Sequence, residues 1–309
     1  RKMLTGLQDY TVEDTTVEWI LYHNNFSLCS RKVRICLYEY DIEFKSKHID
    51  LIETGKYDVA SKDFLKINKN ATVPVLIYKG KPIYESHEQI RFLSNKVEQI
   101  DSLYLNEEDH ERVNFWIEKS SLIGDPVRNH EKYAGNTIGP LTFPLFATMI
   151  KYVSIGEILK GLIRHPMKER VILFLALKIF GLKALKAPPL KRIIKSSFLK
   201  LNDHLQEFED ELLQNESRWI AGNIFSLADV SWAVIFHRIE ECGWDKLLLQ
   251  NKPYCCAYYE EVKSRKSFKK AILDYNHPIL EKGINDLKLA LLNNPNFISL
   301  YKNLETHIL

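Results

Sequence analysis

The chain has 309 residues, 45% of them hydrophobic, and a formal net charge of +3. This length exceeds the usual size of one domain, and the apolar content suffices for substantial buried cores, which favours two domains. A net charge this small gives no argument for nucleic acid, and the sequence contains no recognised nucleic-acid-binding motif. We therefore expect no nucleic-acid partner.

The cysteines indicate a reducing compartment. There are five, an odd number, and none forms a Cys-x-x-Cys pair. A disulfide-stapled secreted protein would show paired cysteines, so we predict a cytoplasmic location. Residues 1–16 form a polar leader without the apolar run of a signal peptide. Because the chain begins at Arg1 and not at a methionine, the presence of an upstream targeting segment is left open.

A cysteine follows the first apolar segment of the chain. Residues 19–22 have the composition of a strand and residues 30–37 have helical spacing, so Cys29 falls at a strand-to-helix turn. Unsatisfied backbone N–H groups and the helix dipole lower a thiol pKa there, and Arg31 and Lys32 add positive charge. The alternative is a small buried hydrophobe, the commoner role of an intracellular cysteine. The local sequence leaves both interpretations open.

The next fifty residues predict a small α/β layer. Residues 44–50 alternate like a half-buried strand, and a polar helical stretch ends near residue 68. Two short apolar segments joined by Lys79-Gly80-Lys81 predict a β-hairpin. Pro74 lies within the first of them and implies an edge, a turn or a cis peptide bond. A helical pattern then follows, with Ser86 as its expected N-cap.

Helical periodicity dominates from residue 98 to residue 277. A stretch from about 137 to 192 is rich in Leu, Ile, Phe and Lys, and prolines interrupt it. No charge-free apolar run reaches the roughly 18–20 residues that a membrane span needs, so an enlarged helical domain is favoured. Basic side chains leave a membrane-surface role as the alternative. They are Lys151, Lys160, Arg164, Lys168, Arg170, Lys178, Lys183 and Lys186.

Two further patterns concern structure and metal binding. Ser226-x-x-Asp229 before an apolar run predicts an N-capping arrangement, to which we assign no catalytic role. The histidines are scattered without a pair at zinc-ligand spacing, so we expect no metal. The sequence also lacks a Gly-x-Ser-x-Gly elbow and a Gly-rich phosphate loop.

Several short motifs occur in a fixed order along the chain. They are Ser27-Leu28-Cys29-Ser30, Val33-Arg34, Leu51-Ile52, Ser61-Lys62-Asp63-Phe64, Asn68, Val73-Pro74-Val75-Leu76, Glu85-Ser86, Trp219-Ile220-Ala221-Gly222-Asn223, Ser226-Leu227-Ala228-Asp229 and Ser264-Arg265-Lys266-Ser267-Phe268. In order and spacing they resemble the cytosolic glutathione transferases. Among the classes of that family, the chain is most similar to the zeta class, which includes the maleylacetoacetate isomerases, and to the related tetrachlorohydroquinone reductive dehalogenases.

The resemblance implies a two-domain fold. An α/β thioredoxin-like N-terminal domain at 17–97 binds glutathione, and an enlarged all-α C-terminal domain occupies 98–277, with the insert at about 137–192. The insert is where the chain departs most from the zeta-like enzymes. The tail at 278–309 lies outside the resemblance.

The resemblance also implies a glutathione site. Val73, before a cis Pro74, would offer its backbone to the cysteinyl part of glutathione. Glu85 would hold the γ-glutamyl ammonium, and Ser86 with the helix N-terminus would hold its carboxylate. Lys56 would neutralise the glycyl carboxylate. Zeta enzymes usually have Gln where Glu85 stands, and an ordinary helix cap is the alternative for Glu85 and Ser86.

The implied function is glutathione-dependent transferase or thiol–disulfide chemistry on a small electrophilic, halogenated or aromatic substrate. Ser27 or Ser30 would favour the thiolate of glutathione, or Cys29 would itself attack the sulfur of a glutathionyl conjugate, as in reductive dehalogenation. Cis–trans isomerisation by transient thiolate addition is a third alternative, and a homodimer is left open. A different class of function is a catalytically weak, transferase-like binding module associated with a membrane or a protein partner.

Overall fold

The computed structural model describes residues 4–97, 107–124, 129 and 132–308, which fall into two compact units. The first, here the sheet unit, combines the N-terminal hundred residues with Met149–Ile179 and Lys266–Glu281. The second, here the helical unit, consists of Asp101–Thr148, Phe180–Arg265 and Lys282–Leu309. The division expected after residue 97 differs from this one, because part of the insert and the segment near residue 270 contact the sheet unit.

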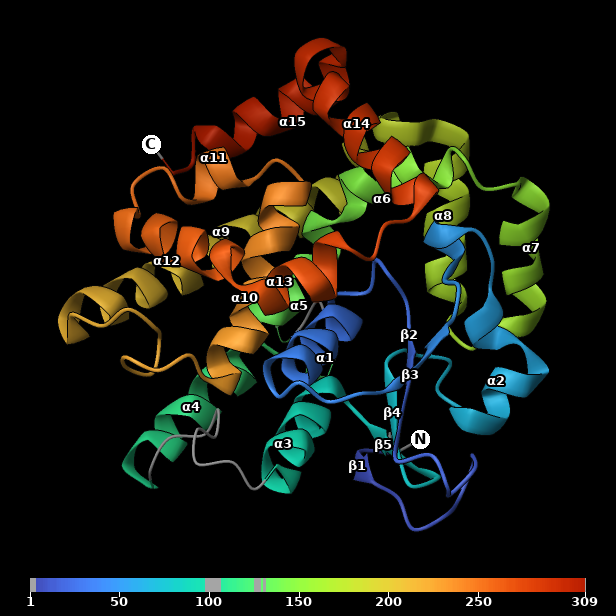
Figure 1. Ribbon diagram of the computed structural model, residues 1–309. Helices are drawn as coiled ribbons and strands as arrows, with labels where there is room; N and C mark the ends of the chain where they lie inside the picture. The colour runs from blue at the N-terminus through green and yellow to red at the C-terminus, as the bar shows by residue number, and fades with distance from the viewer. Residues whose placement is uncertain (1–3, 98–106, 125–128, 130–131, 309) are drawn as a thin grey trace. The chain divides into compact units, whose positions relative to one another are not determined.

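The sheet unit contains a five-stranded mixed sheet in the order β1-β5-β4-β2-β3 (Figure 1). The central strand β2 (Trp19–His23) pairs parallel with β3 (Lys45–His48) and antiparallel with β4 (Val75–Tyr78). β4 pairs antiparallel with β5 (Lys81–Tyr84), which confirms the predicted hairpin. β3 is mostly exposed, because it forms one edge of the sheet.

The polar leader contributes a strand that the sequence did not predict. β1 (Gly6–Leu7) pairs antiparallel with the end of β5 and forms the other edge of the sheet. Two residues are too few to leave an alternating pattern, so only the pairing with β5 reveals this strand.

Helices cover both faces of the sheet. α2 (Lys62–Ile67) covers one face, where Ile20, Val75 and Ile77 pack with Phe64 in a single apolar cluster. Successive side chains of a strand point to opposite faces, so Leu21 and the other intervening residues are buried on the other side. There α1 (Leu28–Glu39) packs against α3 (Ser86–Lys96).

Two short elements precede α2, and two others pack on α1. The 3₁₀ turns η1 (Ile52–Thr54) and η2 (Asp58–Ala60) lead from β3 into α2. α13 (Lys266–Phe268) and the following π-helical turn η4 (Lys269–Leu273) lie against α1, where Figure 1 shows the orange segment beside the blue helix. Residues far apart in the sequence thus complete the sheet unit.

The helical unit is organised around α10 (Leu227–Glu241), whose Trp232 is fully buried. The Trp232 ring lies 4.7 Å from Phe208 and 5.7 Å from Trp116 between centroids, and its Nε1 donates to the Trp116 carbonyl at 3.0 Å. The helices are α4 (Glu107–Ser120), α5 (Ala134–Leu141), α6 (Phe143–Ile150), α9 (Pro188–Asn215), α10 (Leu227–Glu241), α11 (Asp245–Leu248), α12 (Pro253–Ser264), α14 (Pro278–Asn293) and α15 (Pro295–Glu305), with η3 (Gly181–Lys186) before α9; α6 and α14 each have an end in the sheet unit.

The predicted capping arrangement at the start of α10 is confirmed. The Asp229 carboxylate accepts hydrogen bonds from the backbone N–H of Ser226 at 2.8 Å and of Ile220 at 3.0 Å. It is buried, and it also fastens the preceding loop, so its role is structural.

Much of the insert forms two helices of the sheet unit. α7 (Ile155–Arg164) and α8 (Lys168–Phe180) belong to it, apart from the last residue of α8. Among the residues that the structure describes, no helix is long and apolar enough to cross a membrane. The expected C-terminal tail is also helical, in α14 and α15.

Candidate functional site

The loop between β2 and α1 sets the position of Cys29. The Asn24 side chain accepts from the backbone N–H of Phe26 at 2.9 Å and of Ser27 at 3.2 Å. Ser27 is the N-cap of α1, and its Oγ accepts from the Ser30 N–H at 3.3 Å. Cys29 is therefore the second helical residue, in the turn whose N–H groups lack helical partners. A thiolate at this position would be stabilised by the helix dipole.

The five cysteines all carry thiols, in different environments. Cys29 is half-buried, whereas Cys36, Cys242 and Cys255 are buried and Cys256 is exposed on α12. Burial raises the pKa of the Cys36 and Cys255 thiols well above the ordinary range, and it also raises the pKa of Cys256. Cys255 also lies in the first turn of a helix, α12, with Cys256 next to it, but burial raises the pKa of both thiols, so Cys29 is the candidate nucleophile.

The two serines beside Cys29 differ in their surroundings. Ser30 is fully buried, and its Oγ accepts from the backbone N–H of Asn24 at 3.2 Å, so it holds the loop. Ser27 is half-buried and serves as the cap of the helix. Of these two candidates, Ser27 is the one with solvent access.

Arg34, from the Val33-Arg34 motif, fastens the same loop. Its guanidinium is fully buried and donates to the carbonyls of Asn24 at 2.9 Å and Ala271 at 2.7 Å. The Tyr275 ring lies 4.2 Å from its central carbon. The motif is therefore explained by packing of the segment around residue 271 onto the loop that precedes Cys29.

Lys32, which the sequence indicated only as one of two positive charges near Cys29, is a functional candidate in its own right. It lies one turn after Cys29 with no exposed surface, and its ammonium has no hydrogen-bond partner among the described residues. Burial lowers the Lys32 pKa to about 8, while the charges of Cys29 and Glu85 act to raise it. The signal for this burial is that Lys32 shares a helix face with Cys29, Ile35 and Cys36, which lie one turn before and after it. A buried cation beside a cysteine and a carboxylate is typical of a functional site.

The cis peptide bond expected before Pro74 is present, between Val73 and Pro74. The side-chain nitrogen of Gln89 on α3 donates to the Pro74 carbonyl at 3.0 Å and to the Ile83 carbonyl at 2.8 Å. Gln89 thereby ties the segment that precedes β4 to the helix that begins at Ser86. The Val73 side chain is half-buried.

The start of α3 differs from the prediction. Ser86, expected as the N-cap, is the first helical residue, and the N-cap is Glu85, which makes no side-chain capping bond. Glu85 has φ +67°, a left-handed conformation that is uncommon for a residue with a side chain. Burial raises the pKa of its carboxyl, and the Lys32 charge opposes that shift. Its positive φ and its half-buried carboxyl make Glu85 a candidate site residue.

Cations surround the start of α3. Burial lowers the pKa of His87 to about 3, and the charges of Lys32 and Arg91 lower it further, so this imidazole is neutral. Arg91 also pairs with Glu88 at 2.9 Å. The positive charge that acts on Glu85 is therefore supplied by Lys32, whereas the charge of Arg91 acts on His87 and Lys32.

Lys56 lies on the exposed turn between η1 and η2. None of the contacts described for the chain ties its ammonium to Cys29, Val73 or Glu85. The structure thus brings Cys29, Lys32 and Glu85 together electrostatically, and the role of Lys56 stays a prediction. Among the residues that the structure describes, no group of three or more His, Cys, Asp or Glu side chains could hold a metal ion.

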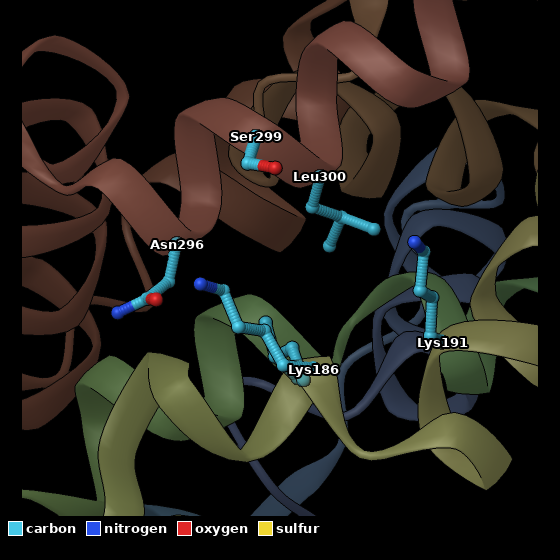
Figure 2. Close-up of a pocket in the computed structure, with 6 residues that line it drawn as sticks. Lys186, Lys191, Asn296, Ser299 and Leu300 are labelled. Carbon is cyan, nitrogen blue, oxygen red and sulfur yellow. The ribbon is translucent and has the colours of Figure 1, made fainter.

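A separate pocket of about 200 Å³ lies in the helical unit between η3 and α15. Figure 2 shows Lys186 reaching from the η3 side toward Asn296 on α15, with Lys191 and Ser299 also at the rim. Its polar lining residues are exposed or half-exposed, and it contains none of the predicted site residues. We assign it no ligand.

Two family models match the chain. The N-terminal domain of glutathione S-transferases matches residues 26–96, and the C-terminal domain matches residues 191–272. In this order they show that the chain belongs to the glutathione S-transferase superfamily, and they confirm the expected fold class. The zeta class is not distinguished by these matches.

The relatives are distant. A tetrachloro-p-hydroquinone reductive dehalogenase of Sphingobium chlorophenolicum is 23% identical over 81% of this chain and 94% of its own length. The glutathione S-transferase TCHQD of Arabidopsis thaliana is 26% identical over 82% of this chain and 90% of its own. Among solved structures, the beta-etherase LigF from Sphingobium sp. strain SYK-6 matches with a TM-score of 0.65 at 19% identity, covering 83% of this chain and 99% of LigF. A likeness at this identity shows the fold alone.

Proposed function

We propose that the chain is a glutathione-dependent enzyme in which Cys29 exchanges disulfides with glutathione and reduces glutathionyl conjugates of small electrophiles. The observation that carries the proposal is the joint placement of Cys29 in the first turn of α1, the buried ammonium of Lys32 one turn later, and Glu85 at the N-terminus of α3. The name of the Sphingobium relative, a reductive dehalogenase, supports this chemistry.

Glutathione would be bound through its backbone and through the charged groups of its γ-glutamyl and glycyl ends. The Val73 backbone beside the cis bond pairs with the cysteinyl part, the Glu85 carboxylate binds the γ-glutamyl ammonium, and Ser86 with the N–H groups of α3 binds the carboxylate. Lys56 remains the proposed partner of the glycyl carboxylate. Burial of Ser86 at the first position of α3 supports its part, since its hydroxyl lies at the end of the helix where anions are stabilised.

The proposed reaction has two exchange steps. The Cys29 thiolate attacks the sulfur of a conjugate GS–R, which forms a Cys29–glutathione disulfide and releases R with the bonding electron pair, to be protonated as R–H. The thiolate of a second glutathione then attacks the mixed disulfide, which yields oxidised glutathione and restores the Cys29 thiolate. Lys32 lowers the energy of the thiolate in both steps by its positive charge.

The test compares Cys29→Ser with Cys256→Ser, which removes the exposed thiol of α12. Treatment with oxidised glutathione followed by mass spectrometry should place the adduct on Cys29 before any other cysteine. Cys29→Ser should abolish disulfide exchange and conjugate reduction, because a hydroxyl cannot replace a thiolate, while Cys256→Ser retains both. Full exchange activity in Cys29→Ser would contradict the covalent mechanism.

Simple conjugation is the alternative activity of the same site, favoured by the half-buried Ser27 cap. In that case Ser27→Ala should reduce conjugation of an electrophile more than Cys29→Ser does, because glutathione supplies its own sulfur. Calorimetry of glutathione binding separates both activities from a module without turnover. Absence of binding at millimolar glutathione would favour that binding module.

A further inference from the structure

The apolar face of α7 is turned to solvent. Ile155, Leu159, Leu162 and Ile163 follow the i, i+4, i+7, i+8 spacing of one helix face, and they are 49%, 44%, 41% and 86% exposed. A surface helix ordinarily packs such a face on the core and shows its polar face to water. α7 leaves most of its apolar face uncovered.

α7 is attached to the sheet unit by its flank. Ile158 and Gly161 are its buried residues, and Gly161 lies so close to Tyr57 that a Cβ there would be 2.4 Å from the ring. His165, just after the helix, lies 5.3 Å from the same ring between centroids. The attachment therefore holds α7 by one side and presents the apolar stripe outward.

α8 adds to the same kind of surface. It buries Val171, Phe174 and Leu177, yet Ile172 and Ile179 are 60% and 62% exposed. Of the twenty large hydrophobic side chains that are exposed in the described residues, eight lie between Tyr152 and Ile179. Single exposed apolar residues are ordinary, but a concentration of this kind marks an interaction surface.

The same segment is strongly basic. Residues 149–179 contain six Lys or Arg and two Glu, a net charge of +4, whereas the whole chain has +3. Arg170 pairs with Glu53 at 2.6 Å and Lys160 pairs with Glu157. Arg164 and Lys168 are exposed, and the Lys168 ammonium donates to the Leu162 carbonyl at 2.6 Å, which places it beside the apolar stripe.

We propose that the outer face of α7 and α8, defined by Ile155, Leu159, Leu162, Ile163, Ile172 and Ile179, lies on an anionic lipid membrane. An amphipathic helix with exposed aliphatic side chains and basic neighbours inserts its apolar face at the headgroup level, while the cations meet anionic lipid. A second copy of the chain fits less well, because self-association through this face would bring two segments of net charge +4 together.

The test measures partition of the full chain onto vesicles of phosphatidylcholine with and without phosphatidylserine. We expect sedimentation with the phosphatidylserine vesicles that weakens as salt is raised. The double variant Leu159→Gln with Ile163→Gln should reduce the partition coefficient by about tenfold. Arg164→Gln with Lys168→Gln should reduce it by about fivefold for each charge removed.

Matched control variants change the same residue types on α14 and α15. Leu289→Gln with Leu292→Gln removes two exposed leucines, and Lys288→Gln with Lys302→Gln removes two exposed cations. These pairs should leave the partition coefficient unchanged, and all variants should keep the glutathione affinity of the parent chain. The outcome does not depend on the activity proposed for Cys29.

Three results would overturn the membrane proposal. One is no sedimentation with phosphatidylserine vesicles even at low salt. Another is an equal loss of binding in the control pairs. The third is a dimer in analytical ultracentrifugation that Ile163→Gln dissociates, which would assign the face to a second copy of the chain.

Discussion

The burial of the Lys32 side chain is the observation that makes this residue a functional candidate. An ammonium without a hydrogen-bond partner is destabilising inside a protein, and its pKa falls to about 8 because the charged form is disfavoured there. A methionine of similar length would avoid this loss of stability. The charge is nevertheless held at this position, beside Cys29 and Glu85. This makes Lys32 a candidate for a role in binding or reactivity.

We expect Lys32→Met to stabilise the folded chain and to weaken glutathione binding. Between the folded pKa of about 8 and the ordinary value of 10.5, the unfolded chain binds more protons, so stability of the parent rises with pH across that window. At neutral pH the full penalty is present, and its removal should add on the order of 3 kcal/mol to the free energy of unfolding. Urea denaturation at several pH values measures it. A destabilised variant with unchanged glutathione affinity would show that Lys32 is only structural.

Ser86 gives a prediction that separates binding from capping. Because Glu85 and not Ser86 is the N-cap, Ser86→Ala removes no capping bond and should change the free energy of unfolding by less than about 0.5 kcal/mol. The loss of a hydroxyl beside a bound carboxylate should weaken glutathione binding by about 1–2 kcal/mol. Calorimetry and thermal melts on the same preparation provide both values. A lower melting temperature with full affinity would restore the cap interpretation.

At the scale of elements, the contact between Gly161 and Tyr57 decides where α7 can sit. The glycine is needed for close approach, since the Tyr57 ring occupies the space of a side chain. The attachment also leaves polar groups unpaired, because the Tyr57 hydroxyl is buried with no partner among the described residues. α7 is thus held by shape more than by hydrogen bonds.

Gly161→Ala should loosen α7. The added methyl group forces the Tyr57 ring to move, and overpacking of this kind lowers the free energy of unfolding by about 1–3 kcal/mol. Hydrogen exchange should become faster in α7 and near Tyr57. The control is Tyr57→Phe, which keeps the ring and loses only an unpaired hydroxyl, so its stability should match the parent. Unchanged exchange in Gly161→Ala would mean that α7 is held elsewhere.

At the scale of the whole molecule, the proposed glutathione contacts all belong to the sheet unit. Cys29 and Lys32 lie in its α1, and Ser86 begins its α3 with Glu85 as the N-cap. Val73 lies in the loop before β4, and Lys56 lies between η1 and η2. A ligand that binds only the folded state stabilises it by an amount that grows with its concentration, about 2.7 kcal/mol at a hundredfold excess over Kd. That stabilisation should protect the backbone amides of the segments that contact the ligand.

Saturating glutathione should therefore slow hydrogen exchange in α1, α3 and the cis-proline segment. The amides of α10 and α12 in the helical unit should exchange at the rate of the unliganded chain. Mass spectrometry of peptic fragments resolves the two groups. Slowing restricted to the helical unit would place the ligand outside the proposed site.

The sequence predicted the features that depend on near neighbours. The turn at Lys79-Gly80, the position of Cys29 at the start of a helix and the Ser226-x-x-Asp229 cap are set by backbone conformation and by hydrogen bonds over a few residues. The resemblance to glutathione transferases rests on the same short segments in a fixed order. Local energetics therefore determined the order of the strands and helices in the first hundred residues.

Only the tertiary structure decided the features that depend on distant partners. The two-residue strand β1 exists because β5 offers it an edge, and Lys32 is buried because α1 packs against α3. The insert was expected in the helical domain, but α7 and α8 belong to the sheet unit, where Tyr57 and Glu53 hold them. An apolar stripe has the same sequence pattern whether it faces a core or water, because the pattern carries no information about the surface that covers the stripe.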